Sequence, residues 1–409
     1  MSFQQGLSGL NAASKNLDVI GHNIANANTT GFKSSRAEFA ELIATAGKTG
    51  GSSSGIGVEV QAVAQQFDQG NVRVTGNSLD VAINGNGFFA LQQTDGSLAY
   101  SRAGDFKLDT SGNLVTNDAS KVLGYTLDPD TGLRTSSSTV PLVFPTSAPI
   151  AAKQTTKITA SFNLDARATD AAGDATATPP VAATPRSTYS TSLNVYDSQG
   201  VAKPVSLYFE KNGNNTWNVY DSLDTTATAV GQLVFDDTGA IVSGFSLTLS
   251  VAPTPPNPNN LAAYNVTLDF ADVSQYGSKF SVSDLSQDGY ASGELTGINI
   301  EDDGTITTRY SNGVSRAEGQ VALASFRNTQ GLASIGGNKW VETSTSGQAT
   351  YGTPTDGSFG ALRSGALEDS NVDLTAELVN MMTAQRNYQA NAQTIKTQDQ
   401  IMSTLVNLR

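Results

Sequence analysis

Apolar residues near the beginning of the chain recur at alternating steps of three and four positions. Ser14 and Gly21 fill the two gaps in this series, which predicts a heptad-like stripe on one face of a helix of about 25 residues. Asn and Thr then become frequent, and Gly31 can adopt a left-handed backbone, so we expect this helix to end by about residue 28. The stripe consists of Phe3, Leu7, Leu10, Leu17 and Ile24.

The end of the chain carries a longer stripe of the same kind. It predicts one helix over 371–407, with Asn371 or Asp373 near its N-cap and with Gln385 and Asp399 as polar interruptions. A core helix packed within its own domain is the alternative. The stripes are narrow and lie at the two ends, which favours coiled-coil helices that require partners. The second stripe consists of Leu374, Leu378, Met381, Tyr388, Ala392, Ile395 and Met402.

The long middle of the chain alternates between apolar and polar residues. Gly, Asn and Asp clusters interrupt these runs at short intervals, a pattern that predicts sandwiches or barrels rather than a parallel α/β sheet. Trp217 and Trp340 lie in strand-like runs and are expected to be core or edge aromatics. The clearest alternating runs are 79–83, 205–209, 245–251 and 266–270.

A polar segment follows the first stripe, and we interpret it as a hydrogen-bonding joint between the terminal helix and the body. A plain helix–turn–helix connection is the alternative. After it, Ser35 and Glu38 match a capping box and predict a second helix carrying Phe39, Leu42 and Ile43. The candidate joint residues are Asn23, Asn26, Asn28, Thr29, Thr30, Gly31, Phe32 and Lys33.

Shifts in composition predict a nested arrangement of domains. Loops are expected at 47–55, 166–186 and 253–260, where small, polar or Pro-rich residues gather. The fold class is therefore multidomain and mainly β, with sandwich-like or barrel-like domains and a coiled-coil domain formed by the two ends. The expected parts are 1–30 with 371–409 as the coiled coil, 31–71 with 361–370 as a connecting segment, 72–145 with 286–360 as a discontinuous β domain, and 146–285 as an inserted outer β domain.

Composition narrows the chemistry that this chain can perform. It has 409 residues, no cysteine and one histidine, which excludes disulfides, thiolate metal sites and cysteine nucleophiles. The net charge of −13 argues against nucleic acid and anionic membranes as partners. No apolar run is long enough for a membrane span, and the first residues do not resemble a cleavable secretory signal.

Three short motifs match catalytic or ligand-binding patterns by letters alone. Residues 51–55 match a nucleophile elbow, but a strand does not precede them and the single histidine, His22, lies upstream. Residues 47–49 match the end of a phosphate-binding loop that lacks its first glycine. Asp128 begins a calcium-like pattern that has Thr139 where a glutamate is required, so a turn is favoured. No catalytic, cofactor-binding or metal-binding residue is assigned, and the chain is not expected to be an enzyme.

One segment is far more specific than these motifs. Residues 16–33, from Asn16 through His22 to Lys33, closely resemble the N-terminal signature of the bacterial flagellar axial proteins, the family of rod and hook subunits. That family usually has Asn at the position of His22. Residues 76–89, 100–106, 367–374 and 382–391 resemble the same family, so the likeness covers the first ~145 and the last ~120 residues.

This resemblance implies a structural role. Rod subunits lack a large β insert, so the block at 146–285 favours a hook-type subunit, with a distal rod or hook–filament junction protein as alternatives. Such a subunit polymerises helically into a short curved tube that joins rod to filament and transmits torque. The implied partners are further copies of this chain, the distal rod protein, the hook–filament junction protein, the hook cap protein and the flagellar type III export apparatus. The implied location is the extracellular hook, reached without signal cleavage.

Two other classes remain as alternatives from the residues alone. A secreted β-sandwich glycoside hydrolase would need convergent carboxylates in a cleft. A β-rich adhesin with coiled-coil ends would lack the polar joint. The low charge of 146–285 adds one further expectation, because a surface of Ser, Thr, Asn and Gln exchanges hydrogen bonds with water at little net cost. We expect that surface to form weak contacts that slide as a tube bends.

Overall fold

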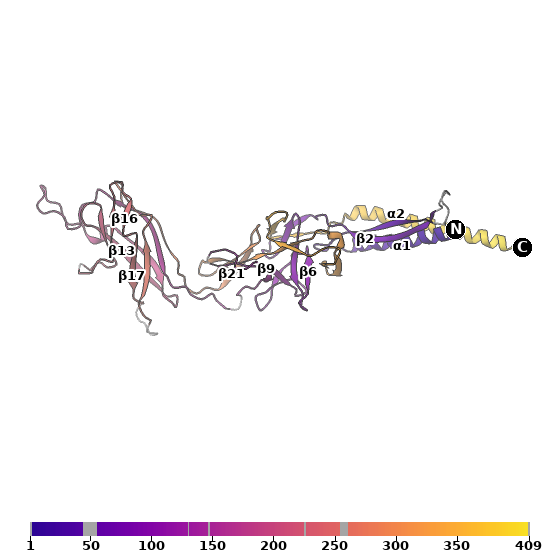
Figure 1. Cartoon of the computed structure of the whole chain (residues 1–409), viewed down its shortest axis with the longest axis horizontal. Coiled ribbons are helices and arrows are strands. Elements are labelled where there is room, and N and C mark those ends of the chain that lie inside the picture. Colours follow the sequence, from indigo (N-terminus) through magenta and orange to yellow (C-terminus); the bar gives the residue numbers. More distant parts are fainter. Residues whose placement is uncertain are drawn as a thin grey trace. The chain divides into compact units, whose positions relative to one another are not determined.

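The computed structural model describes residues 2–43, 55–129, 131–145, 148–224, 226–253 and 261–407. The chain divides into two compact units (Figure 1). The first unit comprises Met1–Ser147, Thr296–Arg309 and Ser315–Arg409, and the second comprises Ala148–Leu295 and Tyr310–Val314. The finer division into four parts stays a prediction. The fold is mainly β with a helix at each end, as predicted.

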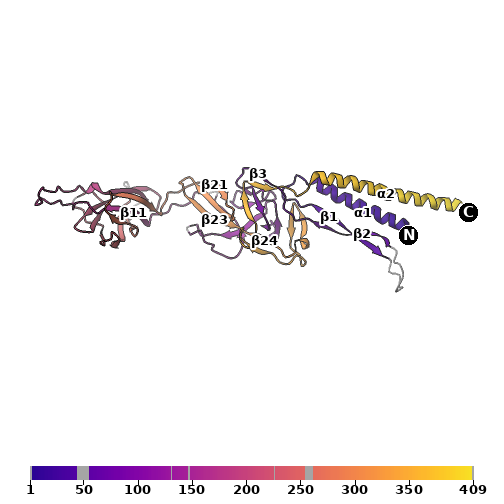
Figure 2. The ribbon, with the colours of Figure 1, turned by 90° about the horizontal axis from the view of Figure 1, so that it is seen from above.

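The two helices lie side by side and antiparallel (Figure 2). Helix α1 spans Ser2–Ala25 and α2 spans Leu374–Asn407. The Asp373 carboxylate accepts the backbone N–H groups of Thr375 and Ala376, at 2.9 and 3.1 Å, so Asp373 is the N-cap of α2. In the described part of the chain, neither helix has an apolar stretch of the length that a bilayer requires.

The predicted second helix is wrong, because residues 35–43 form a strand. Strand β1 (Ser35–Ile43) pairs antiparallel with β2 (Gly55–Gln65) in a long ribbon beside α1. The side chain of Asn23 accepts from the Ser35 N–H and donates to the Ser35 carbonyl, both at 2.8 Å. Glu38 pairs with Arg36 rather than turning back to Ser35. The capping box therefore never forms. The tip of this ribbon, including most of the predicted loop at 47–55, lies outside the described residues.

The rest of the first unit is a β domain. Its longest sheet follows the order β21-β22-β23-β9-β5-β6-β26-β25, and one of its cores gathers Phe88, Tyr100, Phe326 and Trp340. The pairs β4–β28 and β3–β29 bring the segment before α2 alongside residues 72–84. The strands are β3 (Val72–Val74), β4 (Val81–Asn84), β5 (Phe88–Gln92), β6 (Leu98–Ser101), β7 (Lys107–Leu108), β8 (Leu114–Val115), β9 (Lys121–Thr126), β10 (Val140–Pro141), β21 (Leu295–Ile300), β22 (Thr305–Tyr310), β23 (Ser315–Val321), β24 (Leu323–Ser325), β25 (Ala333–Gly336), β26 (Lys339–Val341), β27 (Thr350–Gly352), β28 (Ala361–Ser364) and β29 (Ala366–Glu368).

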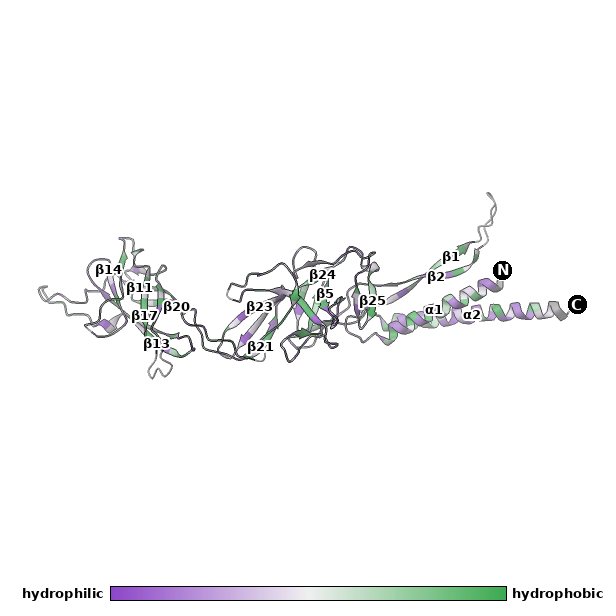
Figure 3. Cartoon of the chain, turned by 60° about the horizontal axis from the view of Figure 1, so that its bottom comes forward, coloured by the Kyte–Doolittle hydropathy of each residue, from purple (hydrophilic) through white to green (hydrophobic). Residues whose placement is uncertain are grey.

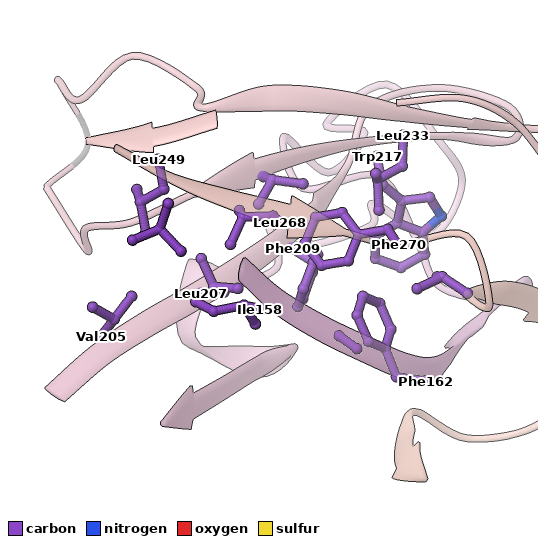
Figure 4. Close-up of a cluster of buried hydrophobic side chains, with 14 of the residues drawn as sticks. Ile158, Phe162, Val205, Leu207, Phe209, Trp217, Leu233, Leu249, Leu268 and Phe270 are labelled. Carbon is purple, nitrogen blue, oxygen red and sulfur yellow. The ribbon is translucent and has the colours of Figure 1, made fainter. Parts of the chain in front are cut away.

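The second unit contains two five-stranded sheets with one shared hydrophobic core (Figure 4). One sheet follows the order β17-β18-β11-β19 with β20 beside β11, and the other follows β12-β13-β14-β15-β16. The predicted alternation is confirmed in β13 and β18, whose apolar positions are buried. The strands are β11 (Lys157–Asp165), β12 (Ser190–Tyr196), β13 (Ala202–Lys211), β14 (Thr216–Tyr220), β15 (Gly231–Phe235), β16 (Ile241–Ser243), β17 (Ser246–Val251), β18 (Tyr264–Asp269), β19 (Ser274–Tyr276) and β20 (Ser281–Gln287).

Both tryptophans are core residues, as predicted. Trp217 is fully buried and donates its indole N–H to Gln275 at 2.8 Å, and Trp340 is buried in the first unit. Residues 166–186 are largely irregular, with an isolated bridge between Asp174 and Val181. The Pro-rich loop predicted at 253–260 lies almost entirely outside the described residues. Strand β11 pairs parallel with β18 and β19, so the second unit is a mixed sandwich.

Candidate assembly surface and joint

The contact between α1 and α2 is built from small and polar residues. A Cβ added at Gly6 would lie 3.2 Å from the Ile395 side chain, and one added at Gly9 would lie 3.0 Å from the Asn391 amide. Ala13 of α1 and Ala384 of α2 are buried. The two helix backbones can therefore approach closely because glycine and alanine lie between them. The large apolar residues of the predicted stripes are not the main content of this seam.

The stripe of α1 lies along the margin of that seam. Leu7 is 43% exposed, and Leu10, Leu17 and Ile24 are half-buried. Phe3 belongs to α1, but its side chain is not among those described. Ribbon β1–β2 covers another part of α1, where the Ser8 hydroxyl accepts the Val58 N–H at 3.3 Å. The apolar stripe of α1 thus remains partly exposed to solvent in the single chain.

The stripe of α2 divides between the seam and the surface. Met381, Ala392 and Ile395 are half-buried, whereas Leu374, Leu378, Tyr388 and Met402 are exposed. Three further apolar residues that the stripe did not include are also exposed, namely Val379, Met382 and Ile401. Apolar and polar residues alternate along the visible length of α2 (Figure 3). The helix pair therefore exposes a large amount of apolar side-chain surface to solvent in the single chain.

The polar joint begins at Asn23, which is buried at the end of α1. Besides its two bonds to Ser35, its amide lies 3.4 Å from Oε1 of Glu377 in the first turn of α2. One side chain therefore links α1, β1 and α2. Asn26 donates to the His22 carbonyl at 2.9 Å, and the Thr29 hydroxyl donates to Asn26 at 3.4 Å.

The chain then turns sharply against the β domain. Gly31 has a φ of +68°, and a Cβ there would lie 2.6 Å from the backbone nitrogen of Ala103. Asn338 donates its amide to the Thr30 carbonyl at 2.8 Å, while Asn28 is exposed. Phe32 is buried and meets the ring of His22 edge-on, with centroids 5.5 Å apart. His22 itself is exposed to solvent.

Lys33 ends the joint inside the protein. Its Nζ lies 2.6 Å from Oε1 of Glu368 and donates to the Asp68 carbonyl at 2.6 Å. Arg102 reaches the other oxygen of Glu368 at 3.3 Å, and its guanidinium stacks over Phe88. Burial lowers the pKa of Lys33 and of Arg102, while the nearby Glu368 carboxylate acts to raise both. One carboxylate thus holds two buried cations.

Several joint residues escaped the sequence-based reasoning. Glu368 and Arg102 complete the buried cluster, and Asn371 accepts the Ser34 N–H and donates to the Gln66 carbonyl, both at 2.8 Å. One signal was available, because a lysine in an otherwise neutral joint requires a carboxylate. The carboxylate that satisfies it lies more than 300 residues away, and spacing alone does not reveal such a partner.

The candidate catalytic motifs gain no support. Residues 47–49 and Ser52–Ser54 lie outside the described part of the chain. The turn at Asp128 is closed by backbone bonds from Gly132 to Asp128 and from Asp128 to Leu133, with Asp130 not described. Among the described residues, no group of three or more His, Asp or Glu side chains is arranged to hold a metal ion.

Family models match most of the chain. They are described as flagella basal body rod protein over residues 3–33, flagellar hook protein FlgE/F/G D1 domain over 82–163, flagellar basal body protein FlaE D2 domain over 163–290, and flagellar basal body rod FlgEFG protein C-terminal over 363–408. The joint and both helices fall within or beside the first and last of these segments.

Full-length relatives carry the same name throughout. The chain is 44% identical over 422 residues to the flagellar hook protein FlgE of Salmonella typhimurium, with 100% of both chains covered. It is 44% identical over 419 residues to that of Escherichia coli, with 100% of both covered. It is 32% identical over 464 residues to that of Treponema pallidum, with 100% of this chain and 99% of that protein covered.

A solved structure supports the fold. The crystal structure of the Helicobacter pylori flagellar hook protein FlgE2 matches with a TM-score of 0.52 and 17% identity, covering 72% of this chain and 100% of that chain. At this identity the likeness concerns the fold alone. Because relatives at 44% identity align over its entire length, the chain belongs to the flagellar hook protein family.

Proposed function

We propose that this chain polymerises through its α1–α2 pair into the curved hook tube that couples the flagellar rod to the filament. The observation that carries the proposal is the exposed apolar surface of the two helices. Leu7, Leu378 and Met382 are each more than 40% exposed in the single chain. Their burial between copies stabilises a polymer by about 25 cal/mol per Å² of apolar surface removed from water.

The helix pair has little core of its own. Its seam relies on glycine and alanine, and Ala384 is the one residue of α2 that is buried among those whose side chains are described. Most of the stability of a helix in a protein comes from tertiary packing, and these two helices have little of it. We therefore expect the pair to gain order on assembly, where neighbouring copies supply the missing contacts.

The joint transmits force between the helix pair and the β domain. Its contacts are specific and buried: Asn23 links α1, β1 and α2, and Lys33 and Arg102 converge on Glu368. Breaking any of them leaves a buried polar or charged group unpaired, which is costly. Such a connection resists torsion better than a chain of glycines and serines.

The second unit supports a surface of weak contacts. Several of its aspartates are engaged by their own turns: Asp174, Asp224 and Asp236 accept the backbone N–H groups of Thr176, Thr226 and Thr238 at 2.8 to 3.0 Å. Hydrogen bonds from the Thr176 side chain and backbone lower the pKa of Asp174. Carboxylate oxygens that already accept hydrogen bonds within a turn are less available for strong ion pairs between copies. Such a surface therefore lets neighbouring copies slide past one another.

The hook position brings further partners into the proposal. The ends of the tube would meet the distal rod protein and the hook–filament junction protein, and its growing end would carry the hook cap protein. Delivery to the extracellular hook would use the flagellar type III export apparatus. The absence of cysteine suits this route, because a chain threaded unfolded through a channel then has no disulfide to reduce.

Truncation tests the division of labour. Chains that lack residues 2–25 or 374–409 are compared with the full chain under salting-out conditions by electron microscopy. The full chain is expected to form curved tubes, and both truncated chains are expected to remain soluble monomers with folded β units by circular dichroism. Tubes formed by either truncated chain would overturn the proposed role of the helices. Failure of the full chain to form any tube would overturn the proposed polymerisation.

A further inference from the structure

Glu377 has an oxygen that no described residue of the single chain satisfies. Its Oε1 faces the Asn23 amide at 3.4 Å, whereas its Oε2 is shielded from solvent and has no hydrogen-bond partner among the described residues. A buried carboxylate oxygen without a donor costs about 1–3 kcal/mol, and more when charged. A feature of this kind calls for a donor from outside the chain.

Glu377 lines a groove between α1, α2 and β1. The groove has a volume of about 340 Å³ and is lined mainly by neutral side chains. Its charged members are Glu377 and Arg36, and Arg36 is already paired with Glu38 at 2.8 Å. Amides line it on both helices, at Asn16, Asn23, Asn380 and Asn387. Their side-chain amides bring further hydrogen-bonding groups to the groove, although the oxygen of Asn23 already accepts the Ser35 N–H.

The groove suits a guanidinium better than an ammonium. Arginine carries five N–H donors in a planar fork, which can bind a carboxylate and hydrogen-bond to neighbouring side-chain amides at the same time. On the two helices, the exposed cations are Lys15, Arg386 and Lys396, and none forms an ion pair with the described residues. Arg386 is the one arginine of this set.

Arg386 lies on the opposite face of α2 from Glu377. The two residues are nine positions apart, which places their side chains about 180° apart around the helix and about 14 Å apart along it. They cannot pair within one chain. Donor and acceptor on opposite faces of one element form a head-to-tail contact, and such a contact builds an open helical filament when the rotation between copies does not close a ring.

We propose that Arg386 of one copy inserts into the Asn-lined groove of a second copy and binds the carboxylate of Glu377. This inference rests on the proposed polymerisation and names a polar contact within it. The apolar residues Leu378 and Met382 then supply area beside the contact, while the ion pair sets its register. A carboxylate desolvated beforehand by its own fold needs little further desolvation when the guanidinium arrives.

Charge exchange tests the pairing. We expect Arg386→Glu to raise the critical concentration for tube formation at least about tenfold, since it opposes two carboxylates. The exchange Glu377→Arg with Arg386→Glu should restore the critical concentration to within about threefold of the native chain. Lys396→Glu is the matched control, with the same charge change on the same helix, and it should have an effect below about twofold. Helical and β signals of each monomer by circular dichroism monitor folding.

Cross-linking provides a second test, in which Glu377 and Arg386 both remain unchanged. The chain has no cysteine, so a single thiol can be placed in each of two variants. Asn380→Cys lies beside the acceptor Glu377, and Gln389→Cys lies beside the donor Arg386. The two variants are mixed before assembly. A short bismaleimide should link them in tubes but not in monomers at the same concentration. Lys396→Cys in place of Gln389→Cys lies two turns further along α2 and should link poorly.

The outcomes separate this inference from the function on which it rests. If the native chain forms no tubes, the proposed polymerisation fails first. If native tubes form and Arg386→Glu assembles like Lys396→Glu, Arg386 does not bind Glu377 and the pairing is wrong. If the exchanged pair fails to fold, the cross-link between positions 380 and 389 decides: a link supports the contact and its absence overturns it.

Discussion

Nζ of Lys33 lies 2.6 Å from Oε1 of Glu368, although 335 positions of the chain separate the two residues. Both side chains are fully shielded from solvent. The pair joins the segment that follows α1 to the strand that precedes α2, so it fastens the helix pair to the β domain at both ends. Its partner Arg102 comes from the loop after β6.

Removing one member of this cluster should be severe. We expect Glu368→Gln to lower the free energy of unfolding of the first unit by about 3–5 kcal/mol, because two buried cations lose their counter-ion. Urea denaturation followed by circular dichroism measures the change. The matched control is Asp369→Asn, which removes the exposed Arg73 pair at 3.2 Å and should cost less than about 1 kcal/mol. Equal effects of the two substitutions would contradict the role of burial.

Gly31→Ala tests the sharp turn of the joint. The new Cβ would lie 2.6 Å from the Ala103 nitrogen, in addition to the strain of a positive φ. Gly76→Ala carries the same kind of strain at φ +79° with nothing within 4 Å. We expect Gly31→Ala to cost more than about 2 kcal/mol and Gly76→Ala about 1 kcal/mol. Thermal unfolding of both variants measures the difference, and similar midpoints would show that the close approach to Ala103 is unimportant.

The exposed stripe of α2 should affect assembly and not folding. We expect Leu378→Ser combined with Met382→Ser to leave the monomer's unfolding midpoint nearly unchanged, because both side chains are about half exposed. The critical concentration for tubes, measured by sedimentation, should rise at least about tenfold for the lost apolar burial. Leu133→Ser, at a residue that is 70% exposed and lies away from the helices, is the control. A comparable loss of assembly in that control would argue against a stripe-specific effect.

Gly9→Val addresses the seam between the helices. Its side chain would collide with the Asn391 amide, which a Cβ alone already approaches to 3.0 Å. We expect weaker helix pairing and a several-fold higher critical concentration. Gly21→Ala, with nothing within 4 Å of the added Cβ, should instead favour α1 by about 1 kcal/mol. Assembly of Gly9→Val at the native concentration would mean that the seam opens in the tube.

The outer surface of β17 offers a test of sliding contacts. Ser246 and Thr248 are exposed on that strand. Leucine at both positions should convert weak polar contacts into adhesive ones and give straighter, stiffer tubes. Tube curvature in electron micrographs and swimming of cells that carry the variant are the measurements. Asn at both positions is the polar control, and unchanged curvature in the leucine variant would refute the sliding surface.

Local patterns predicted the elements whose causes are local. Apolar spacing identified both terminal helices, and alternation identified the buried faces of β13 and β18. The capping box at Ser35 predicted a helix that does not form. The Asn23 side chain hydrogen-bonds to both the N–H and the carbonyl of Ser35, and residues 35–43 pair as a strand with residues 55–65. The joint was predicted as polar, but its partners Glu368 and Arg102 were not, since only the folded chain brings them together.

The antiparallel pairing of α1 with α2 makes the first residues of the chain depend on the last. A polypeptide interrupted before residue 368 carries Lys33 without its carboxylate and α1 without its partner helix, so both the joint and the assembly end are incomplete. Such a chain is therefore expected not to pair with neighbouring copies. On the proposed assembly, completeness of the chain thus becomes a structural condition for joining the tube.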